Sequence, residues 1–309
     1  MYKKLILVTR KTRLQALVER FNTRSQAKFY IEHAGGDFTD YECEEDAYQR
    51  SLDIVRRSLE FEIPQQLVDR GLVPTFHFQK DDLVVTLGQD GVVANTAKYV
   101  GNQPIVAVNP EPSRFDGVLL PFTPDQARGA VAKVMEAKAN IREITLAEVI
   151  LNDGQRLLAF NDLFIGARSH VSALYRIACG HQSETQSSSG VLVSTGAGST
   201  GWISSAFNMA AGVAKLCGGK SGPAIRLPWE DRRLLYVVRE PFLSRHSQAA
   251  IVAGMLGPGE DLSLQSLMPS GGVIFSDGME ADFLNFNSGA SAQVRAAEQR
   301  AHLVVGGPS

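Results

Sequence analysis

Three short apolar runs in the first 110 residues, separated by segments with helical character, restrict the fold more than any other feature. The runs are Leu5–Val8, Asp82–Leu87 and Pro104–Asn109. Between them, Thr12–Arg24 has apolar residues at helical spacing, and the charged segment Glu44–Asp69 also has the character of a helix. Strands that alternate with helices in this way are typical of a parallel sheet. We therefore expect an α/β domain over residues 1–120.

The pattern changes near Pro121. Thr123–Ala139 is expected to form a helix that Thr123 caps, and short β-type runs separated by turn residues follow it. These runs are Ile144–Leu151, Arg156–Phe160, Ala173–Ala178, Gly190–Val193, Leu234–Val238, Ala249–Val252 and Gly272–Phe275. We expect a β-rich domain over residues 121–289. Two further local predictions are a short strand at Phe29–Ile31 and a loop at Gln182–Ser189.

The composition excludes several classes of protein. The 309 residues carry a formal net charge of −2, so no global positive field would attract nucleic acid or an anionic membrane. The three cysteines are far apart and the histidines lack metal-ligand spacing, so neither disulfides nor a resident metal is expected. The run Leu5–Val8 is too short for a signal peptide, and no run approaches the roughly 20 apolar residues of a membrane span. We expect a cytoplasmic protein that binds neither nucleic acid nor membrane.

A buried-type strand that runs into two glycines is the first segment with chemical meaning. Gly88-Gln89-Asp90-Gly91 follows the second apolar run, and a helix is expected over Ala94–Val100. Ligands bind at the carboxyl ends of parallel strands, and a helix N-terminus favours phosphate. Because phosphate repels a carboxylate, Asp90 there needs an explanation. It is a general base towards a hydroxyl, an indirect Mg²⁺ ligand, or only a cap of the helix.

A second glycine-rich segment lies in the β-rich half. Gly196, Gly198 and Gly201 have the G-x-G-x-x-G spacing of a dinucleotide-binding loop. The dehydrogenase motif should follow the first strand of a βαβ unit and precede an acid by about 20 residues, and this context is missing. What remains is a loop rich in hydroxyls that suits phosphate or ribose, unless it is an ordinary turn. The hydroxyl residues are Ser194, Thr195, Ser199 and Thr200.

Other polar residues stand at the ends of apolar runs. Asn161 and Asp162 precede an apolar strand, where an amide and a carboxylate recognise both donors and acceptors of a polar ligand, or simply form a turn. Arg10 follows the first strand and is either a phosphate contact or a solvated surface arginine. Ser276-Asp277-Gly278 predicts a plain hairpin turn.

Taken in order, these segments resemble the NAD kinase family, most closely its mitochondrial-type branch. The family motif Gly-Gly-Asp-Gly-Thr is matched by Gly88-Gln89-Asp90-Gly91-Val92, and the family's Asn-Glu pair by Asn161-Asp162. The Thr-Gly-Ser loop is matched by SSGVLVSTGAGSTGW, and the form with Trp202 is that of the mitochondrial-type branch. VTRKTR, PIVAVNPEPSRFDGVLLP and VVREPFLSR extend the similarity over most of the chain.

The resemblance implies a two-domain enzyme, with a Rossmann-like α/β domain, a β-rich NAD-binding domain, and a tail over residues 290–309 that returns to the first domain. It implies phosphoryl transfer from ATP, with Mg²⁺, to the 2′-hydroxyl of the adenosine ribose of NAD, which gives NADP. Asp90 would be the base. The nucleotide-binding residues would be Gly88, Gly91, Arg10, Asn109, Asn161, Asp162, Thr195, Gly198, Ser199 and Thr200. The resemblance also implies a homodimer or larger assembly.

Three positions depart from the family pattern: Gln89 replaces a glycine, Val92 a threonine and Asp162 a glutamate. Gln89 is expected to crowd a phosphate or to require φ < 0 in a turn that favours glycine, and Val92 removes a hydroxyl near the phosphates. These departures motivate two alternatives to an active NAD kinase. One is a non-catalytic dinucleotide-binding protein, and the other is a kinase of the same superfamily that acts on a sugar or lipid hydroxyl.

Overall fold

A computed structural model describes residues 2–220 and 222–306. The chain forms two compact units, one of residues 1–142 with 302–309 and the other of residues 143–301. The division comes later than the boundary expected near residue 121, because helix α5 (Ala127–Met135) packs into the core of the first unit. Strands β5 (Asn140–Leu151) and β16 (Ser291–Val305) contribute residues to both units. Of the expected returning tail, only the residues from His302 onwards belong to the first unit.

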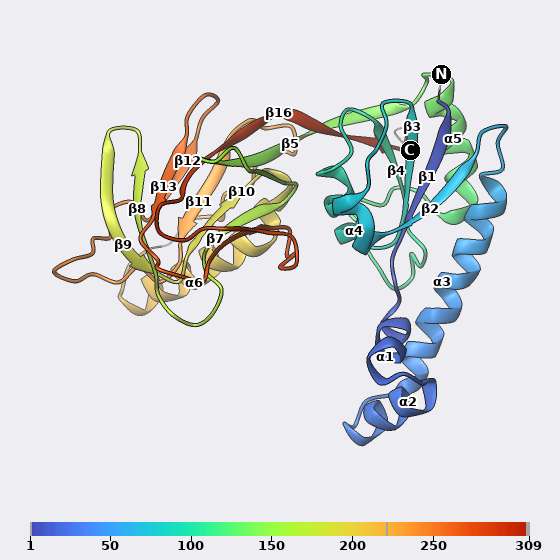
Figure 1. Ribbon diagram of the computed structural model, residues 1–309, viewed down its shortest axis with the longest axis horizontal. Coiled ribbons are helices and arrows are strands. Elements are labelled where there is room, and N and C mark those ends of the chain that lie inside the picture. Colours follow the sequence, from blue (N-terminus) through green and yellow to red (C-terminus); the bar gives the residue numbers. More distant parts are fainter. Residues whose placement is uncertain (1, 221, 307–309) are drawn as a thin grey trace. The chain divides into compact units, whose positions relative to one another are not determined.

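The first unit is built on a parallel sheet (Figure 1). Its strand order is β2 (Gln65–Asp69), β1 (Lys4–Thr9), β3 (Asp82–Leu87) and β4 (Pro104–Val108), and the end of β16 pairs in parallel with β4. The three apolar runs of the sequence are β1, β3 and β4, which are buried along nearly their whole length. Burial on both faces explains why these strands are apolar throughout rather than alternating. The predicted Rossmann-like sheet is confirmed.

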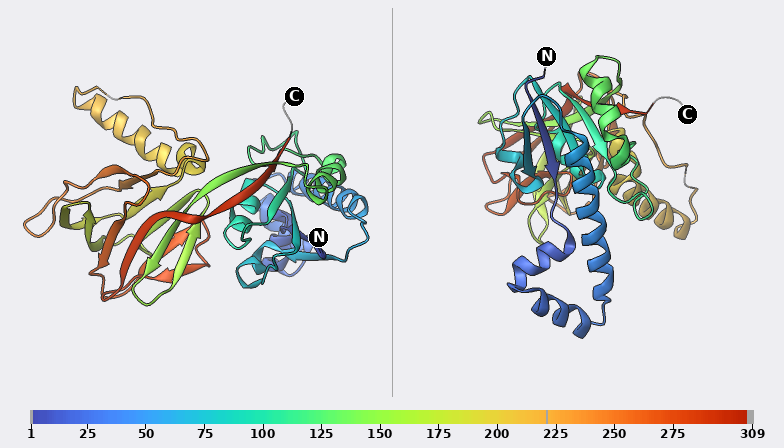
Figure 2. Two further views of the ribbon diagram at one scale, coloured as in Figure 1. Left: turned by 90° about the horizontal axis from the view of Figure 1, so that it is seen from above. Right: turned by 90° about the vertical axis from the view of Figure 1, so that its right-hand side faces the viewer.

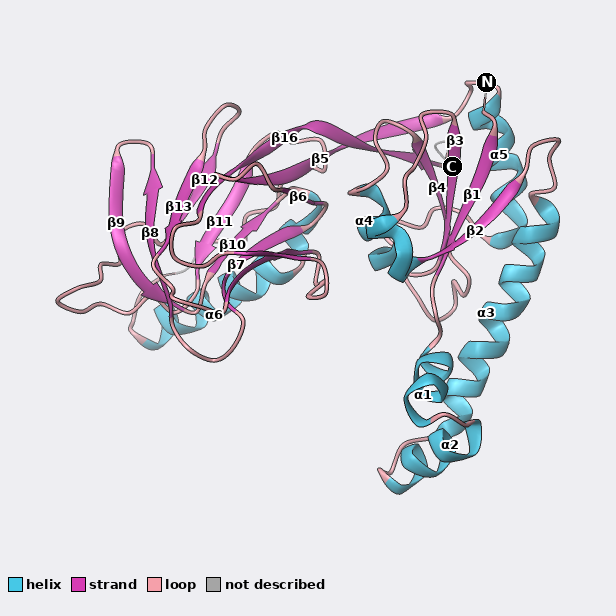
Figure 3. Ribbon diagram, viewed as in Figure 1, coloured by secondary structure: helices cyan, strands magenta, loops and turns pink. Residues whose placement is uncertain are grey.

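Helices cover both faces of this sheet (Figure 3). On one face lie α3 (Phe38–Ser58) and α5, whose buried residues meet alternate residues of β1, β3 and β4. The other face carries α4 (Asp90–Ala97). Two short helices, α1 (Arg13–Phe21) and α2 (Arg24–His33), pack beside the first half of α3. Short 3₁₀ helices span Arg70–Thr75 and Pro124–Gln126.

The second unit contains two antiparallel sheets around one core. The first sheet has the order β16, β13 (Leu262–Ser266), β8 (Ala173–Cys179) and β9 (Gln182–Ser188), with β5 paired to β16 and β6 (Arg156–Ala159) paired to β5. The second has the order β12 (Ala253–Leu256), β11 (Leu234–Val238), β10 (Val191–Ser194), β7 (Asp162–Ala167), β14 (Gly272–Ser276) and β15 (Phe283–Asn285). The inward side chains of both sheets form the largest core.

One helix covers the outer face of the second sheet. After the 3₁₀ turn Ala197–Thr200, α6 (Trp202–Leu216) runs across this face (Figure 2) and packs Ile203 against Leu235 and Val237 of β11. The β-rich second half that the sequence predicts is therefore confirmed. Within the described ranges, no helix has the length and apolar content needed to cross a membrane.

Besides the segment Gln182–Ser189, three local predictions are wrong. Phe29–Ile31 lies in α2, because the Thr23 side chain accepts a hydrogen bond from the Gln26 N–H and caps a helix. The helix predicted to reach Asp69 ends at Ser58, and the chain then forms β2. Ala249–Val252 lies just before β12 rather than in a strand.

The predicted loop at Gln182–Ser189 is strand β9, and this correction has a chemical reason. The segment lacks the apolar alternation that marks a half-buried strand, because its buried residues are polar. Gln186 accepts a hydrogen bond from the Tyr175 hydroxyl at 3.0 Å and donates to the carbonyl of Ile251 at 2.9 Å. Glu184 accepts hydrogen bonds from the Ala250 and Ile251 N–H groups. These buried bonds satisfy the polar side chains, which a count of apolar residues does not detect.

Candidate functional site

The turn that joins β3 to α4 is shaped by close packing. A Cβ atom added to Gly88 would lie 2.6 Å from Cγ2 of Val92, so only glycine fits at this position. Gln89 has φ −93° and ψ 170°, an ordinary extended conformation, and its side chain is exposed. The backbone strain expected from Gln89 is therefore absent. Asp90 is the first residue of α4, so the amide groups of the helix N-terminus lie beside this turn.

The Asp90 carboxylate is held by the loop that follows β4. Its Oδ1 accepts a hydrogen bond from the Leu119 N–H at 2.8 Å. Asn109 is buried and shapes the same loop, because its Nδ2 donates to the Phe115 carbonyl and its Oδ1 accepts from the Glu111 N–H. Both ends of the Asn109 amide are thus engaged within the loop. The carboxylate of Asp90 is fixed at one oxygen and remains partly exposed.

Two arginines flank the glycine turn. The Cδ atom of Arg10 lies 3.6 Å from the Cβ position of Gly88, and the guanidinium of Arg70 lies 3.9 Å from that of Gly91. Arg10 stacks on the ring of Tyr48 at 5.1 Å, and its Nε is buried without a hydrogen-bond partner among the described residues. Burial lowers the pKa of Arg70, and the charge of Arg10 lowers it further. Two cations at a helix N-terminus give this turn the electrostatics of an anion site.

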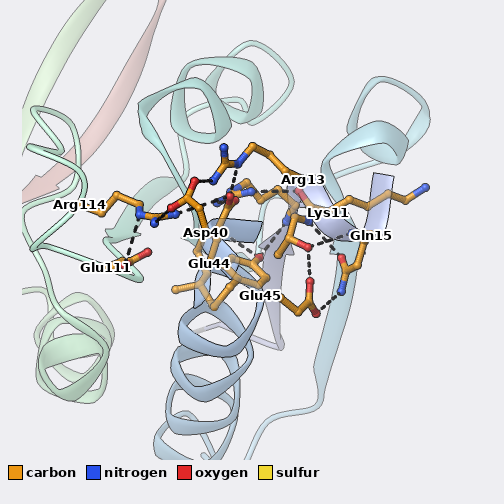
Figure 4. Close-up of polar contacts among 12 residues, drawn as sticks. Lys11, Arg13, Gln15, Asp40, Glu44, Glu45, Glu111 and Arg114 are labelled. Atoms are coloured by element: carbon orange, nitrogen blue, oxygen red, sulfur yellow. Dashed lines mark hydrogen bonds and ion pairs between the residues drawn. The ribbon is translucent and has the colours of Figure 1, made fainter. Parts of the chain in front are cut away.

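A buried carboxylate, Glu44, holds Arg10 in place, and Figure 4 shows Glu44 together with Asp40 and Arg13. Glu44 of α3, 2% exposed, accepts a hydrogen bond from Arg10 Nη2 at 2.9 Å and another from Arg13 Nε. Asp40 forms ion pairs with Arg13 and with Arg114 of the loop after β4. Burial raises the pKa of Glu44, but the hydrogen bonds and charges of Arg13 and Arg10 outweigh it, and the net pKa is lowered. The network ties the loop after β1 to α3 and to the loop after β4.

In the second unit, Asp277 organises the turn between β6 and β7. Its carboxylate accepts hydrogen bonds from the N–H groups of Phe160 at 3.0 Å, Asn161 at 2.6 Å and Asp162 at 3.3 Å. Asp277 has φ +52°, in the left-handed region that is uncommon for residues other than glycine. The hairpin predicted at Ser276–Gly278 joins β14 to β15, and it also supports the Asn161–Asp162 pair.

The glycine loop packs directly against this same turn. A Cβ atom added to Gly198 would lie 2.1 Å from the carbonyl oxygen of Asn161, so this glycine permits close approach of two backbones. Thr195 donates its N–H to the Asn161 carbonyl at 2.9 Å and its hydroxyl to the Phe160 carbonyl at 2.6 Å. The hydroxyls that are buried and bonded to backbone groups are those of Ser194, Thr195 and Ser199. Thr200, by contrast, is exposed.

The carboxyl group of Asp162 is in an unusual state. It is 8% exposed, and burial raises its pKa to about 7, with the charge of Asp277 adding to the shift. Near neutral pH it therefore exists both as a hydrogen-bond donor and as an acceptor. The adjacent Asn161 is partly exposed. The pair thus offers a titrating carboxyl and an amide at one strand terminus.

Comparison with known proteins adds an independent line of observation. No family model matches the chain. An NAD kinase of Chlorobium phaeobacteroides is 27% identical over 130 residues, a region that spans 40% of this chain and 45% of that protein. Yeast NADH kinase, solved with NADH, aligns with a TM-score of 0.58 at 16% identity over 99% of this chain and 84% of that one. An NAD kinase from Archaeoglobus fulgidus, solved with ATP, aligns with a TM-score of 0.55 at 15% identity over 97% and 93%.

The chain has the NAD kinase fold. The curated match adds a partial sequence similarity to one NAD kinase. On this fold, the predicted site residues form one group in each unit. The first unit holds Arg10, Gly88, Asp90, Gly91 and Asn109, and the second holds Asn161, Asp162, Thr195, Gly198, Ser199 and Thr200. Within the described residues, no three histidine, cysteine, aspartate or glutamate side chains gather as metal ligands do.

Two residues of these groups were not predicted from the sequence as site residues. Arg70 follows β2 within a short 3₁₀ turn, and only the parallel pairing of β2 with β1 brings it beside Arg10. Asp277 is more than 100 residues from the turn that it supports. Its position in Ser-Asp-Gly after a strand was visible, but the pattern predicts a hairpin and says nothing of a distant partner. On the NAD kinase fold, both contacts arise from strand order rather than from local sequence.

Proposed function

We propose that this protein is an NAD kinase that transfers the terminal phosphoryl group of ATP to the 2′-hydroxyl of the adenosine ribose of NAD. The observation that carries the proposal is the turn at residues 88–91, where a fixed carboxylate and two arginines meet a helix N-terminus. The proposal is supported by the fold, by a curated relative named NAD kinase, and by neighbours solved with NADH and with ATP. Phosphoryl transfer depends mainly on positioning and on stabilisation of charge, which such a turn provides.

The first unit would hold ATP and accept the proton. Gly91 is exposed and leaves the backbone open to phosphate oxygens, Gly88 shapes the turn by close packing, and Arg10 and Arg70 would neutralise the phosphate charge. Mg²⁺ would arrive as part of the ATP substrate, coordinated by phosphate oxygens. Asp90 has one oxygen held by Leu119, which orients the other oxygen to take the proton of the attacking hydroxyl.

The second unit would bind NAD. The partly exposed amide of Asn161 and the carboxyl of Asp162 would recognise hydroxyls of the ribose, and the hydroxyl of the exposed Thr200 would contact nucleotide. Thr195, Gly198 and Ser199 would act by fixing the turn on which this pair is carried. Asp277 would have the same positioning role through its three backbone hydrogen bonds.

The proposal extends to finer features that stay predictions. They are membership of the mitochondrial-type branch, Mg²⁺ as the cation of ATP, a homodimer or larger assembly, and a cytoplasmic location. Each has its own test, and none is needed for the proposed reaction at the two groups of residues.

A non-catalytic dinucleotide-binding protein is the second candidate, and one observation favours it. Val92 is fully buried and packs a methyl group on Gly88, where the family threonine would place a hydroxyl near the phosphates. A non-catalytic protein of this kind would bind NAD but would not use ATP. Because Gln89 introduces no backbone strain, the loss of the Val92 hydroxyl is the main remaining argument for it.

One assay separates the candidates. NADP formation from NAD, ATP and Mg²⁺ is measured with an NADP-specific dehydrogenase, for the natural protein and for Asp90→Asn. We expect turnover that falls by about 10²- to 10⁴-fold in Asp90→Asn while NAD binding is kept, as for loss of a general base. Asp46→Asn, an exposed change on α3, is the matched control and should leave turnover unaltered. NAD binding without turnover in the natural protein would reject the kinase and favour the second candidate.

A further inference from the structure

Helix α6 is apolar on more of its surface than its packing uses. Its contact with the second sheet is made near its start, where Ile203 and Phe207 belong to the cluster that includes Leu235 of β11. Within α6, all of whose residues are described, Ile203 alone is buried. The second half, residues 208–216, contains a single charged residue, Lys215. A helix that is apolar on most sides is usually covered, so the exposure of this half needs an explanation.

Three large side chains of the second half form one exposed stripe. Met209, Val213 and Leu216 are spaced by four and three residues, which places them on one face of the helix. They are 49%, 56% and 87% exposed. Ile225, in the segment that returns beside α6 (Figure 2), is exposed as well. Single exposed apolar side chains are ordinary, but a row of them marks a contact surface.

The opposite side of the second half is loosely packed. A cavity of about 330 Å³ lies between this side and residues 222–225. Apart from Asn208, the α6 residues that line it are apolar: Phe207, Ala210, Ala211 and Ala214. Residues 208–220 and 222–226 therefore form an apolar projection from the second sheet, which we call the α6 lobe.

The charges of the α6 lobe all have one sign. Lys215, Lys220 and Arg226 are exposed, and residues 202–229 contain no aspartate or glutamate. The whole chain has a net charge of −2, so this positive charge is a local property. Lys215 directly precedes Leu216 and so lies roughly 100° around the helix from it. Its ammonium group can therefore stay in water while the stripe is buried.

These charges fit an anionic partner better than a second copy of the chain. In a two-fold contact the same patch meets itself, so the cations of both copies would come together without acids from residues 202–229. An anionic lipid surface offers apolar chains to the stripe and negative charge to the cations. The expectation that the protein binds no membrane rests on net charge and on the absence of a spanning segment. Neither property governs a helix that lies on a membrane surface.

We propose that the α6 lobe binds the surface of a membrane that contains anionic lipids. The stripe of Met209, Val213 and Leu216 would enter the boundary between headgroups and acyl chains. The three cations of the lobe would lie beside lipid phosphates. The strength of such binding depends on the apolar area buried and on the electrostatic attraction to the lipids. This assignment does not depend on the proposed kinase activity.

Sedimentation with vesicles tests the proposal directly. The full chain is mixed with vesicles of phosphatidylglycerol and phosphatidylcholine in equal parts, or of phosphatidylcholine alone. We expect binding to the anionic vesicles to be tighter by about tenfold or more, and high salt to reduce this difference. Leu216→Gln should weaken binding about tenfold through lost apolar burial, and Lys215→Gln about fivefold. Leu243→Gln, which changes another exposed leucine outside the lobe, is the matched control and should have no effect.

A fluorescent label shows which part of the chain meets the lipid. Cys217 directly follows α6, Cys43 lies in α3 of the first unit, and both are exposed. An environment-sensitive dye on Cys217, in a Cys43→Ser background, should shift its emission to the blue on anionic vesicles. The same dye on Cys43, in a Cys217→Ser background, should show no shift.

Three results would overturn the proposal. Absence of binding to anionic vesicles, or equal binding to both kinds of vesicle, would reject an anionic lipid surface as the partner. Binding that Leu216→Gln leaves unchanged would place the contact elsewhere on the molecule. A dimer in solution that Leu216→Gln dissociates, without vesicle binding, would assign this face to a second copy. Leu216 is largely exposed, so Leu216→Gln is expected to fold; if it does not, Lys215→Gln carries the test.

Discussion

At the scale of single residues, two glycines of the candidate site serve packing rather than turn conformation. Gly198 and Gly88 both lie outside the positive-φ region, yet each would bring a Cβ atom within 2.6 Å or less of a neighbour. A sequence motif shows that a glycine is present, but it does not show whether the glycine is needed for close packing or for a turn conformation. The two reasons predict different outcomes on substitution with alanine.

Gly198→Ala is expected to lower the free energy of unfolding by about 1–3 kcal/mol and to weaken NAD binding. The added methyl group would meet the Asn161 carbonyl at 2.1 Å, so the loop and the turn must separate. Gly212→Ala is the matched control in the exposed part of α6, where nothing lies within 4 Å, and it should stabilise by about 0.5–1 kcal/mol. Urea denaturation measures both. If Gly198→Ala stabilised the protein as Gly212→Ala does, the packing role of Gly198 would be contradicted.

Asp162 predicts a dependence of stability on pH. Burial and the charge of Asp277 raise the folded-state pKa to about 7, above the unfolded value near 4. Between these values the unfolded chain releases a proton that the folded chain keeps, so stability falls as pH rises from about 4 to about 7 and then levels. Asp162→Asn removes this pH-dependent contribution. As pH rises from about 4 to about 7, the free energy of unfolding of the variant should therefore increase relative to that of the natural protein, by up to a few kcal/mol. Denaturation at pH 4, 5.5 and 8 measures it, and a constant difference would reject the raised pKa.

At the scale of elements, the sequence predicted the strands and helices that depend on local patterns of apolar residues. Strands β1, β3 and β4 are continuous apolar runs because helices bury both of their faces. Strand β9 was missed because its inward residues are Glu184, Gln186 and Ser188, whose burial depends on distant partners. For the candidate site, Asp90 was predicted at the carboxyl end of a parallel strand, where ligands of α/β sheets bind, and the Asn161–Asp162 pair was predicted from an amide and a carboxylate that precede an apolar strand. Arg70 was not found, since only the register of a parallel sheet places it.

The ion-pair network of α3 gives a prediction for a whole helix. Glu44→Gln removes the charge that offsets Arg10 and Arg13 in a buried site, and it should lower the free energy of unfolding by about 3–5 kcal/mol. Glu42→Gln breaks the more exposed pair with Arg24 and should cost less than about 1 kcal/mol. Thermal and urea denaturation compare the two. A similar small cost for both would mean that α3 is held by its apolar face alone. If the proposed function holds, Glu44→Gln should also raise the KM for ATP more than that for NAD.

At the scale of the whole molecule, the two compact units carry different halves of the proposed chemistry. Each unit has its own core, and each presents its own group of polar residues at strand ends. Ligands that bind the folded state stabilise it by mass action, and the effect is largest in the segments they contact. The two substrates should therefore leave separate signatures along the chain.

Hydrogen exchange of backbone amides reads these signatures directly. Mg²⁺ with ATP should slow exchange around residues 86–92, where amide groups would face phosphate oxygens. NAD should slow exchange around residues 160–163 and 194–200, and Asp90→Asn should leave this NAD pattern intact. If NAD protects its segments and ATP does not protect residues 86–92, the non-catalytic candidate is favoured, because the turn that contains Val92 then does not bind the phosphates of ATP. If each substrate protects its own segment, the proposed kinase is favoured. If the protection of residues 86–92 by ATP is then lost when Arg70 and Arg10 are both changed to glutamine, those two arginines bind the phosphates of ATP.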